Sequence, residues 1–341
     1  MYSFIEVQKK LLPDLLSTMQ KRYQILKSIY FMEPVGRRTL AGELGHSERV
    51  LRSEVEFLKD QKLISIQSSG MSVTDQGLKV LQDLESMMRE ITGINEMEEQ
   101  LKKILNLQEV VIVPGNSDET PWVKGELGRA CAKRMKLHLD GKNIIAVTGG
   151  TTMATVADML TSNFTENEII FVPARGGIGE DVKNQANTIC AKMAENTGSQ
   201  HRVLYVPDQV SKEVYDSIVK EPMINEVLHL IKNANIVLHG IGDAHTMAKR
   251  RKTKEEDMRK IIDGHAVGEA FGYYFNEDGD IVHKVPTIGL QLNDLPKVKN
   301  VLAVAGGTSK AKAIKAFMKA TTKSTVLITD EGAAKEILNL S

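Results

Sequence analysis

The chain of 341 residues is poor in cysteine and lacks the spacings of common metal sites. Its two cysteines, Cys131 and Cys190, fall in segments predicted to be helical and form no CxxC pair. This favours buried thiols in a reducing compartment over a disulfide framework. The eight histidines form no HExxH motif and no paired spacing typical of zinc ligands. We therefore expect a protein without a bound metal.

Long apolar runs are also missing, since none reaches the roughly 18 residues of a membrane span. The first residues, Met1 to Glu6, lack the basic segment and apolar stretch of a signal peptide. The formal net charge is zero, which argues against a surface generally coated by nucleic acid. Hydrophobic residues make up 42% of the chain, enough to form a core. These features predict a cytoplasmic protein of two or three domains with no membrane partner.

The first quarter of the sequence predicts helices at residues 21–32, 37–44 and 48–61. Pro34-Val35-Gly36 separates the first two, and the turn at Gly45-His46 separates the second from the third. Two short alternating runs follow, with Ser68-Ser69-Gly70 as the turn of a hairpin. Two helices joined by a glycine turn and followed by a hairpin are typical of a winged helix-turn-helix. We assign residues 1–88 to this domain, including a connector helix.

Polar residues on the third predicted helix suit the reading of double-stranded operator DNA. Ser47 is a favourable N-cap for this helix. Arg49 and Arg52 could reach guanine edges or phosphates, and Arg37 and Arg38 could anchor the DNA backbone. The alternative is a small helical bundle with a solvated charged face. The hairpin in this position favours DNA binding.

Residues 75–105 are predicted to form a helix with an apolar seam, interrupted at Thr92-Gly93. The seam could serve dimerisation or pack against its own domain, and the sequence does not distinguish the two. Helix-turn-helix proteins usually bind symmetric sites as dimers, so a homodimer or homotetramer is expected on that ground too.

From residue 108 onward, short apolar runs alternate with helical segments. Such a pattern predicts an α/β domain with a parallel sheet buried on both faces, spanning residues 89–341. Ligands of such sheets bind beyond the carboxyl ends of the strands. The expected strands lie at residues 110–113, 144–147, 169–172, 203–206, 236–239, 301–304 and 326–328.

Two glycine turns at strand ends suggest a ligand with two anionic ends. Thr148-Gly149-Gly150-Thr151-Thr152 follows one strand, and Ala305-Gly306-Gly307-Thr308-Ser309-Lys310 follows another. Glycine lets the backbone approach an anion closely, and a helix N-terminus offers unpaired N–H groups and a partial positive charge. The two turns therefore predict two phosphate positions in one site.

Further polar residues fall at the same predicted edge of the sheet. Arg175 could bind a phosphate bidentately, and Gln185 could bind a hydroxyl group. Gly240-Ile241-Gly242-Asp243 resembles the start of a dinucleotide fingerprint but lacks its third glycine, so we reject a Rossmann cofactor site. Arg250 and Arg251 could serve an anion or end a solvated helix.

Long stretches of the chain resemble the SorC/DeoR family of bacterial transcriptional regulators, over almost the full length. The stretches are QKKLLPDLLSTMQKRYQIL, EPVGRRTLAGELGHSERVLRSEVEFLK, SDETPWVKGELGRA, AVTGGTTMATVADM, FVPARGGIGEDVKNQANTICAKMAE, HGIGDAHTMAKRR, EAFGYYFN and TDEGAAKEIL. The resemblance implies a repressor of glycolytic genes that binds DNA through its N-terminal domain. It also implies an effector domain like sugar-phosphate isomerases and deaminases that binds fructose 1,6-bisphosphate, with dihydroxyacetone phosphate as another possible ligand.

The resemblance also implies roles for individual residues. One phosphate would lie on the first glycine turn, with Arg175 nearby, and the other would lie at Lys310 and the second turn. Gln185 and Glu269 would bind sugar hydroxyls. The residues expected to bind the ligand are Gly149, Gly150, Thr151, Thr152, Arg175, Gln185, Arg250, Arg251, Glu269, Gly306 and Lys310.

Two other functions remain open at this point. The chain could be a sugar-phosphate isomerase or deaminase with an attached regulatory module, in which Glu269 or Asp243 acts as base with help from His239 or His245. It could instead sense a nucleotide, although no cluster of aromatic residues for base stacking stands out near the glycine turns. The predicted DNA-binding domain favours a regulator that is not an enzyme and has no cofactor.

Overall fold

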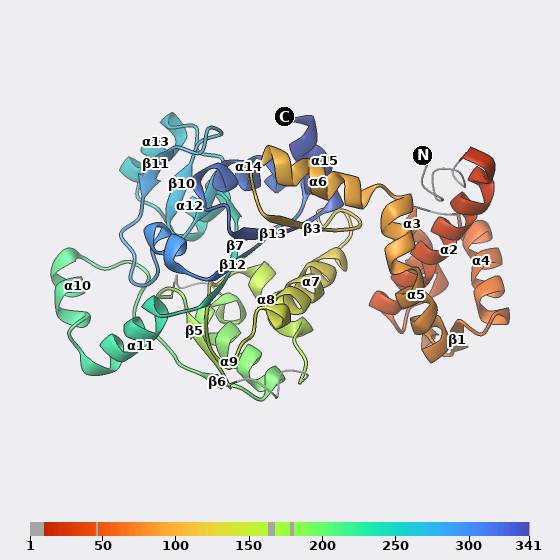
Figure 1. The fold of residues 1–341 in the computed structure, drawn as a ribbon, viewed down its shortest axis with the longest axis horizontal. Coiled ribbons are helices and arrows are strands. Elements are labelled where there is room, and N and C mark those ends of the chain that lie inside the picture. Colours follow the sequence, from red (N-terminus) through yellow and green to blue (C-terminus); the bar gives the residue numbers. More distant parts are fainter. Residues whose placement is uncertain (1–9, 46, 163–167, 178–180, 341) are drawn as a thin grey trace. The chain divides into compact units, whose positions relative to one another are not determined.

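The computed structural model describes residues 10–45, 47–162, 168–177 and 181–340. Met1 to Glu6 and His46, which the sequence predictions name, lie outside the described part, as do residues 178–180 of one stretch that carries the family resemblance. The chain forms two compact units, Met1–Glu96 and Met97–Ser341 (Figure 1). The predicted boundary after residue 88 falls inside the helix α5 (Asp75–Ile91), and this domain assignment stays a prediction.

The N-terminal unit has the element order of a winged helix-turn-helix, which confirms that prediction. Gly45, in the left-handed conformation with φ 62°, ends the helix Arg37–Leu44. The side chain of Ser47 accepts a hydrogen bond from the N–H of Val50 and so caps the next helix, Glu48–Asp60. Ile25, Leu51 and other apolar residues of the helices form one buried cluster. The elements are α2 (Pro13–Met32), α3 (Arg37–Leu44), α4 (Glu48–Asp60), β1 (Ile64–Gln67), β2 (Gly70–Val73) and α5 (Asp75–Ile91), with β1 and β2 antiparallel.

The apolar seam of α5 packs within its own unit. Met88 and Ile91 form a cluster with Leu16 of α2, and Leu84 packs against it. These contacts support the second of the two alternatives for the seam. The predicted interruption is confirmed, because α5 ends at Ile91 and α6 (Ile94–Ile104) begins after Thr92-Gly93.

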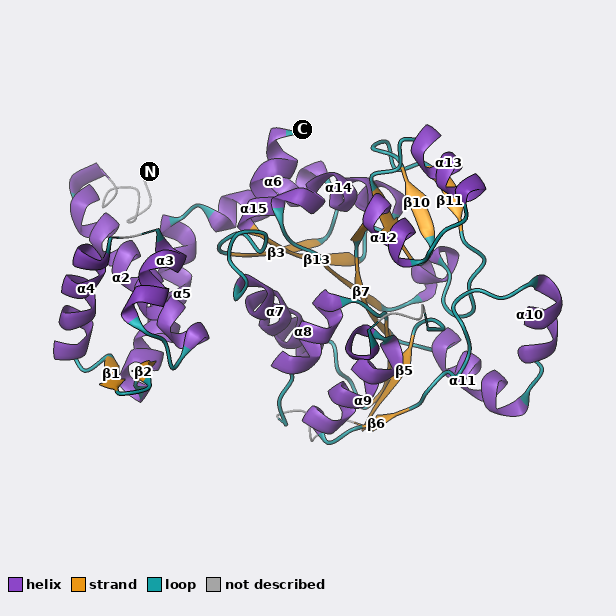
Figure 2. Ribbon diagram, turned by 180° about the vertical axis from the view of Figure 1, so that it is seen from behind, coloured by secondary structure: helices purple, strands orange, loops and turns teal. Residues whose placement is uncertain are grey.

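The C-terminal unit is built on a seven-stranded sheet in which every neighbouring pair is parallel (Figure 2). Alternate residues such as Ile145 and Val147 join one apolar cluster, and Ala146 between them is also buried, so both faces are covered. The predicted α/β fold is thereby confirmed. In spatial order the strands are β3 (Glu109–Val113), β13 (Thr325–Asp330), β12 (Asn300–Val304), β7 (Ile236–Gly240), β4 (Lys142–Val147), β5 (Glu168–Pro173) and β6 (Gln200–His201).

Helices connect these strands and cover the sheet, with α7 and α8 on one side and α14 and α15 on the other (Figure 2). Cys131 of α7 (Val123–Leu137) and Cys190 of α9 (Ala186–Thr197) both belong to the large buried apolar cluster of this unit. Both are free thiols, as predicted, and burial raises the pKa of Cys131 to about 12. The helices are α7 (Val123–Leu137), α8 (Thr151–Met159), η1 (Val182–Asn184), α9 (Ala186–Thr197), α10 (Lys212–Ile218), α11 (Pro222–Lys232), α12 (Ala244–Arg250), α13 (Glu255–Asp263), η2 (Leu292–Lys297), η3 (Thr308–Lys310), α14 (Ala311–Ala320) and α15 (Glu331–Asn339).

Two features of this unit differ from the sequence prediction. The expected strand at residues 203–206 is absent, because the side chain of Asn187 bonds both the N–H and the carbonyl of Leu204 in place of a neighbouring strand. A small antiparallel sheet was not predicted. It consists, in spatial order, of β11 (Ile281–Lys284), β10 (Tyr273–Phe275), β9 (Gly268–Ala270) and β8 (Gly242–Asp243).

The helices of the described residues are all too short or too polar to cross a membrane.

Candidate ligand site and nucleic-acid interface

The centre of the parallel sheet contains a topological switch point. Strands β4 and β7 are neighbours, yet the chain runs from β4 to β5 on one side and from β7 to β12 on the other. Their loops diverge and leave a crevice at the carboxyl ends, where ligands of such sheets bind. Thr148 ties the loop after β4 to the end of β7, since its N–H donates to Leu238 O at 3.0 Å and its Oγ1 accepts from Gly240 N at 3.3 Å.

A cavity of about 110 Å³ lies at this crevice. One water molecule needs about 10–15 Å³ on the same measure, so the cavity admits a ligand of many atoms rather than a single ion. Of the residues predicted to bind the ligand, all but Gly306 line this cavity. The lining also includes Asp208, which was not predicted from the sequence. The predicted residues in the lining are Gly149, Gly150, Thr151, Thr152, Arg175, Gln185, Arg250, Arg251, Glu269 and Lys310.

The first glycine turn presents unpaired backbone donors to the cavity. Helix α8 begins directly after Gly150, which has a φ of 122° and provides no side-chain cap. Within the described part of the chain, nothing accepts a hydrogen bond from the backbone N–H of Gly149, Thr151 or Thr152. A Cβ at Gly149 would lie 2.8 Å from the carbonyl oxygen of Asn184, so only glycine fits there. An anion is the natural partner of such a helix start.

The second glycine turn differs, because acceptors of the chain itself occupy its donors. Gly307 N donates to Asp330 Oδ2 at 2.7 Å, and Ser309 N donates to Asp118 Oδ2 at 2.8 Å. Thr308 N lies 3.4 Å from Asn116 Oδ1, its acceptor. Gly306 packs against Asp330 and lies outside the cavity lining. The backbone N–H groups of Gly307, Thr308 and Ser309 are therefore already occupied in this structure, whereas three of those in the first turn have no acceptor among the described residues.

Lys310, at the end of the second turn, does reach the cavity. Burial holds the pKa of Lys310 below its ordinary value, and the positive charges of Lys124 and Arg250 lower it further, against the attraction of Asp118 and Asp330. None of the described carboxylates forms an ion pair with it. A partly buried ammonium group among other cations is unfavourable unless an anion joins it. The lining of the cavity thus combines backbone donors at the start of α8 with the cationic side chains of Arg250 and Lys310.

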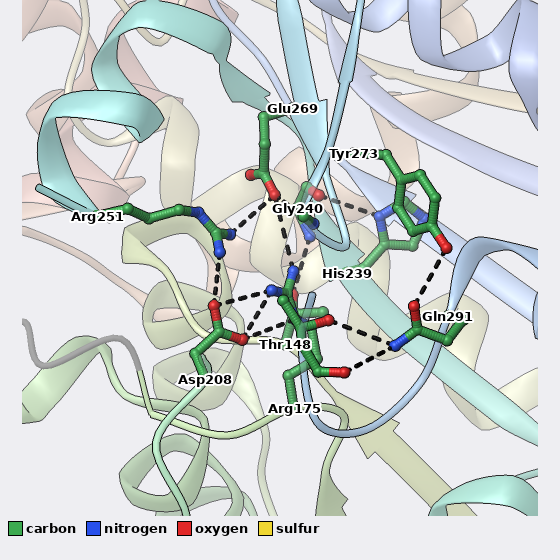
Figure 3. A network of polar contacts seen from close by, with 11 residues as sticks. Thr148, Arg175, Asp208, His239, Gly240, Arg251, Glu269, Tyr273 and Gln291 are labelled. Carbon is green, nitrogen blue, oxygen red and sulfur yellow. Dashed lines mark hydrogen bonds and ion pairs between the residues drawn. The ribbon is translucent and has the colours of Figure 1, made fainter. Parts of the chain in front are cut away.

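The wall of the cavity also contains a closed network of two arginines and two carboxylates (Figure 3). Arg175 binds Asp208 through both Nε and Nη2, at 3.1 and 2.7 Å. Arg251 donates to Asp208 at 2.5 Å and to Glu269 at 2.9 Å. Arg175 lies 3.7 Å from Glu269 and completes the ring. Arg175 was expected to hold a phosphate bidentately, but its guanidinium group is already paired with Asp208.

The network is buried and electrically balanced, with Arg175 7% exposed and Asp208 3% exposed. Burial opposes the charge of Arg251, but Glu269 and Asp208 outweigh it and raise the pKa of Arg251. Glu269 also accepts from the N–H of Gly272 at 2.6 Å. The ring holds charged acceptors rigidly at the cavity wall, which suits hydrogen bonds to hydroxyl groups.

Asp208 follows Pro207 in an irregular segment, and its sequence neighbourhood contains no motif that would have identified it.

Three of the four groups considered for acid–base catalysis have structural partners, and the fourth, His245, is exposed on α12. Asp243 caps α12 by accepting from the N–H of Thr246 at 2.8 Å. Burial lowers the pKa of His239 to about 4, and its Nδ1 lies 3.0 Å from Gly240 O. Glu269 is held in the arginine network. These contacts argue against the enzyme alternative.

The N-terminal unit presents the predicted DNA-binding arginines on its surface. Arg37, Arg38, Arg49 and Arg52 are all exposed, and Leu51, Val55 and Leu58 bury the opposite face of α4. Arg52 pairs with Glu56 at 3.1 Å along the same helix. Ser47 acts as the helix cap, so its observed role is structural.

A second ionic cluster fixes α4 to α2. Glu54 accepts from Arg22 at 2.8 Å and pairs with Lys21 at 2.5 Å. Burial opposes ionisation of Glu54, but these two cations outweigh it and hold the pKa of Glu54 below its ordinary value. The cluster orients the exposed face of α4.

Comparison with known families divides the chain in two. Residues 18–88 match the CggR N-terminal DNA binding domain, and residues 89–339 match a family described as a sugar-binding domain. The second match covers most of the chain. The protein thus combines a DNA-binding domain with a sugar-binding domain.

Curated relatives match the chain over nearly its full length. The central glycolytic genes regulator of Priestia megaterium is 60% identical over 339 residues, which is 99% of both chains. The protein of the same name from Bacillus subtilis is 55% identical over 338 residues, again 99% of both. Both relatives are named as regulators rather than as enzymes.

Solved structures place the fold in the same group. A SorC family transcriptional regulator from Enterococcus faecalis is 49% identical with a TM-score of 0.69, covering 71% of this chain and 99% of its own. The full-length sorbitol operon regulator SorC from Klebsiella pneumoniae shares 15% identity with a TM-score of 0.65, over 93% of this chain and 97% of its own, and shows likeness of fold alone. The chain therefore belongs to the SorC family of transcriptional regulators, in the group that contains the central glycolytic genes regulators.

Proposed function

We propose that this chain represses glycolytic genes and that fructose 1,6-bisphosphate, bound in the cavity at the ends of β4 and β7, modulates its affinity for operator DNA. The observation that carries the proposal is the set of groups that line this cavity. Backbone N–H groups at the start of α8 have no acceptor among the described residues, and the side chain of Lys310 lines the same cavity. The names of the full-length relatives support the glycolytic role.

In this proposal one phosphate binds the backbone and hydroxyl groups of Gly149 to Thr152. The other binds the side chains of Lys310 and Arg250, both of which line the cavity. Glu269 and Gln185 bind hydroxyl groups of the sugar between them. Arg175 and Arg251 act by holding Asp208 and Glu269 in place. Dihydroxyacetone phosphate, with a single phosphate, would satisfy only one of these two positions.

DNA binding would use the exposed face of α4 in the major groove. Arg49 and Arg52 would contact base edges or phosphates, and Arg37 and Arg38 at the start of α3 would contact the DNA backbone. Since such domains usually read symmetric sites, the active form is a homodimer or homotetramer. As a chromosomal regulator it would act in the cytoplasm.

The response requires that the sugar phosphate bind one state of the assembly more tightly than another. Typical couplings between two sites are about 1–3 kcal/mol, or roughly 5–150-fold in affinity. The proposal therefore predicts a change of this size in operator affinity or cooperativity when the bisphosphate binds.

A mobility-shift titration tests this, with a duplex selected by the full chain from a random pool. Adding fructose 1,6-bisphosphate should weaken binding of the selected duplex, and an equal concentration of unphosphorylated fructose should have no effect. Operator affinity and cooperativity that stay the same at saturating bisphosphate would contradict the proposal.

A further inference from the structure

An internal carboxylate occupies the anion position of the second glycine turn. Asp118, on the loop between β3 and α7, accepts from Ser309 N at 2.8 Å and from Ser309 Oγ at 3.1 Å. Gly307 has a φ of 97°, and a Cβ there would overlap the Asp118 side chain. The close approach of this carboxylate therefore requires glycine at position 307.

The partners of Asp118 and Asp330 differ in a way that separates their roles. Asp330 is fully buried and also accepts from Ser117 N and Ala333 N, so it is a fixed part of the turn. Asp118 is exposed, and among the described residues its carboxylate accepts hydrogen bonds from Ser309 alone. An exposed carboxylate can exchange such bonds for water at little cost. Asp118 is therefore the replaceable anion of the two.

Asp118 also affects the charge of Lys310, one of the cations that line the cavity. Its charge favours the protonated form of Lys310, which directly follows Ser309 and lines the cavity. A phosphate bound to Lys310 would add negative charge close to Asp118, and like charges at short range repel. A phosphate at Lys310 would therefore bind against the repulsion of a carboxylate that is held by the neighbouring residue, Ser309.

We propose that Asp118 is a built-in competitor of the second phosphate and determines how strongly the site prefers doubly over singly phosphorylated sugars. The inference rests on the proposed function of the cavity. A ligand with a phosphate at Lys310 has to displace or tolerate Asp118, whereas a phosphate on the first glycine turn does not meet it. Ligand binding would also release the β3–α7 loop from Ser309.

Calorimetric titration of the full chain with fructose 1,6-bisphosphate tests this inference. Asp118→Asn keeps a side-chain acceptor for Ser309 but removes the charge. We expect it to bind the bisphosphate about two- to fivefold more tightly, the size of an exposed charge pair. Asp118→Glu restores the charge and should bring the affinity back toward that of the unchanged chain.

Fructose 1-phosphate and fructose 6-phosphate are titrated in the same way. The monophosphate that binds the first glycine turn should gain less affinity from Asp118→Asn than the bisphosphate does.

Glu119→Gln is the matched control. It removes one exposed charge from the same loop, where Glu119 accepts from Asn116 at 3.0 Å. This control should change bisphosphate affinity by less than the Asp118 substitution does.

The outcomes separate the two proposals. If the unchanged chain binds no bisphosphate, the proposed function fails and this inference fails with it. If the unchanged chain binds but Asp118→Asn has equal or lower affinity for the bisphosphate, only the inference about Asp118 is overturned. Equal gains for the bisphosphate and both monophosphates would also overturn it.

Discussion

At the scale of one residue, Lys310 illustrates how a group that serves a ligand can lower the stability of the ligand-free protein. Burial and neighbouring cations lower its pKa. The unfolded chain therefore binds more protons than the folded one between the folded pKa and the ordinary value of 10.5. It follows that the protonated lysine destabilises the free protein at neutral pH, and that this loss is relieved as pH rises through that window.

Lys310→Met should separate stability from binding. Methionine has a similar length without a charge, so we expect a higher melting temperature for the ligand-free chain and weaker binding of fructose 1,6-bisphosphate. Thermal unfolding with and without the bisphosphate measures both effects. Lys249→Met, at an exposed position on α12, is the control and should change neither by as much. A variant that loses stability and keeps its affinity would refute this role of Lys310.

At the scale of elements, three helix starts at the same sheet edge differ in how they are capped. Asp243 caps α12, and Asp118 and Asp330 fill the donors before α14. At the start of α8, none of the residues that the structure describes supplies such an acid. The sequence predicted glycine turns at the ends of β4 and β12 correctly, because strand, turn and helix are local patterns. It did not show which turn was filled, because Asp118 precedes Ser309 by 191 residues.

Local patterns were also insufficient for residues 203–206 and for the small antiparallel sheet. The run Val203 to Val206 is apolar like a strand, but the amide of Asn187 takes the hydrogen bonds of Leu204. The strands β8 and β9 have only two and three residues, too few to establish a periodic pattern. Glu269, in β9, was identified through family resemblance, and Asp208 was not identified at all. The structure and role of these residues depend on contacts with residues distant in the sequence, which local patterns do not reveal.

A carboxylate introduced at the start of α8 should compete with a phosphate for the backbone N–H groups there. Thr151→Asp places a carboxylate in the first turn of α8, where negative charge stabilises a helix by about 0.3–1 kcal/mol. We expect the ligand-free protein to be slightly more stable and bisphosphate affinity to fall at least tenfold, because two anions would share one set of donors. Thr151→Asn, which lacks the charge, is the control for calorimetry and should retain more affinity. Equal losses in both variants would point to a role of the hydroxyl group instead.

At the scale of the whole molecule, each unit has its own apolar core, so each can hold its binding surface without the other. The presence of two binding sites on one chain is therefore not sufficient for regulation. The ligand has to change the equilibrium between states of the assembly that differ in DNA affinity. DNA binding itself can be tested on the N-terminal surface by comparing positions that differ in their expected contacts.

Arg52 and Arg37 are expected to serve different parts of the DNA. Arg52→Ala should cost about 1–3 kcal/mol on a selected duplex and little on random DNA, since a base contact carries sequence information. Arg37→Ala should weaken both and reduce the slope of log K against log salt by about 1, because a phosphate contact releases counterions. Fluorescence anisotropy at several salt concentrations measures these effects. Lys79→Ala removes an exposed charge from α5 and is the control. Equal losses on selected and random duplexes for Arg52→Ala would assign Arg52 to the backbone and leave Arg49 as the candidate reader of bases.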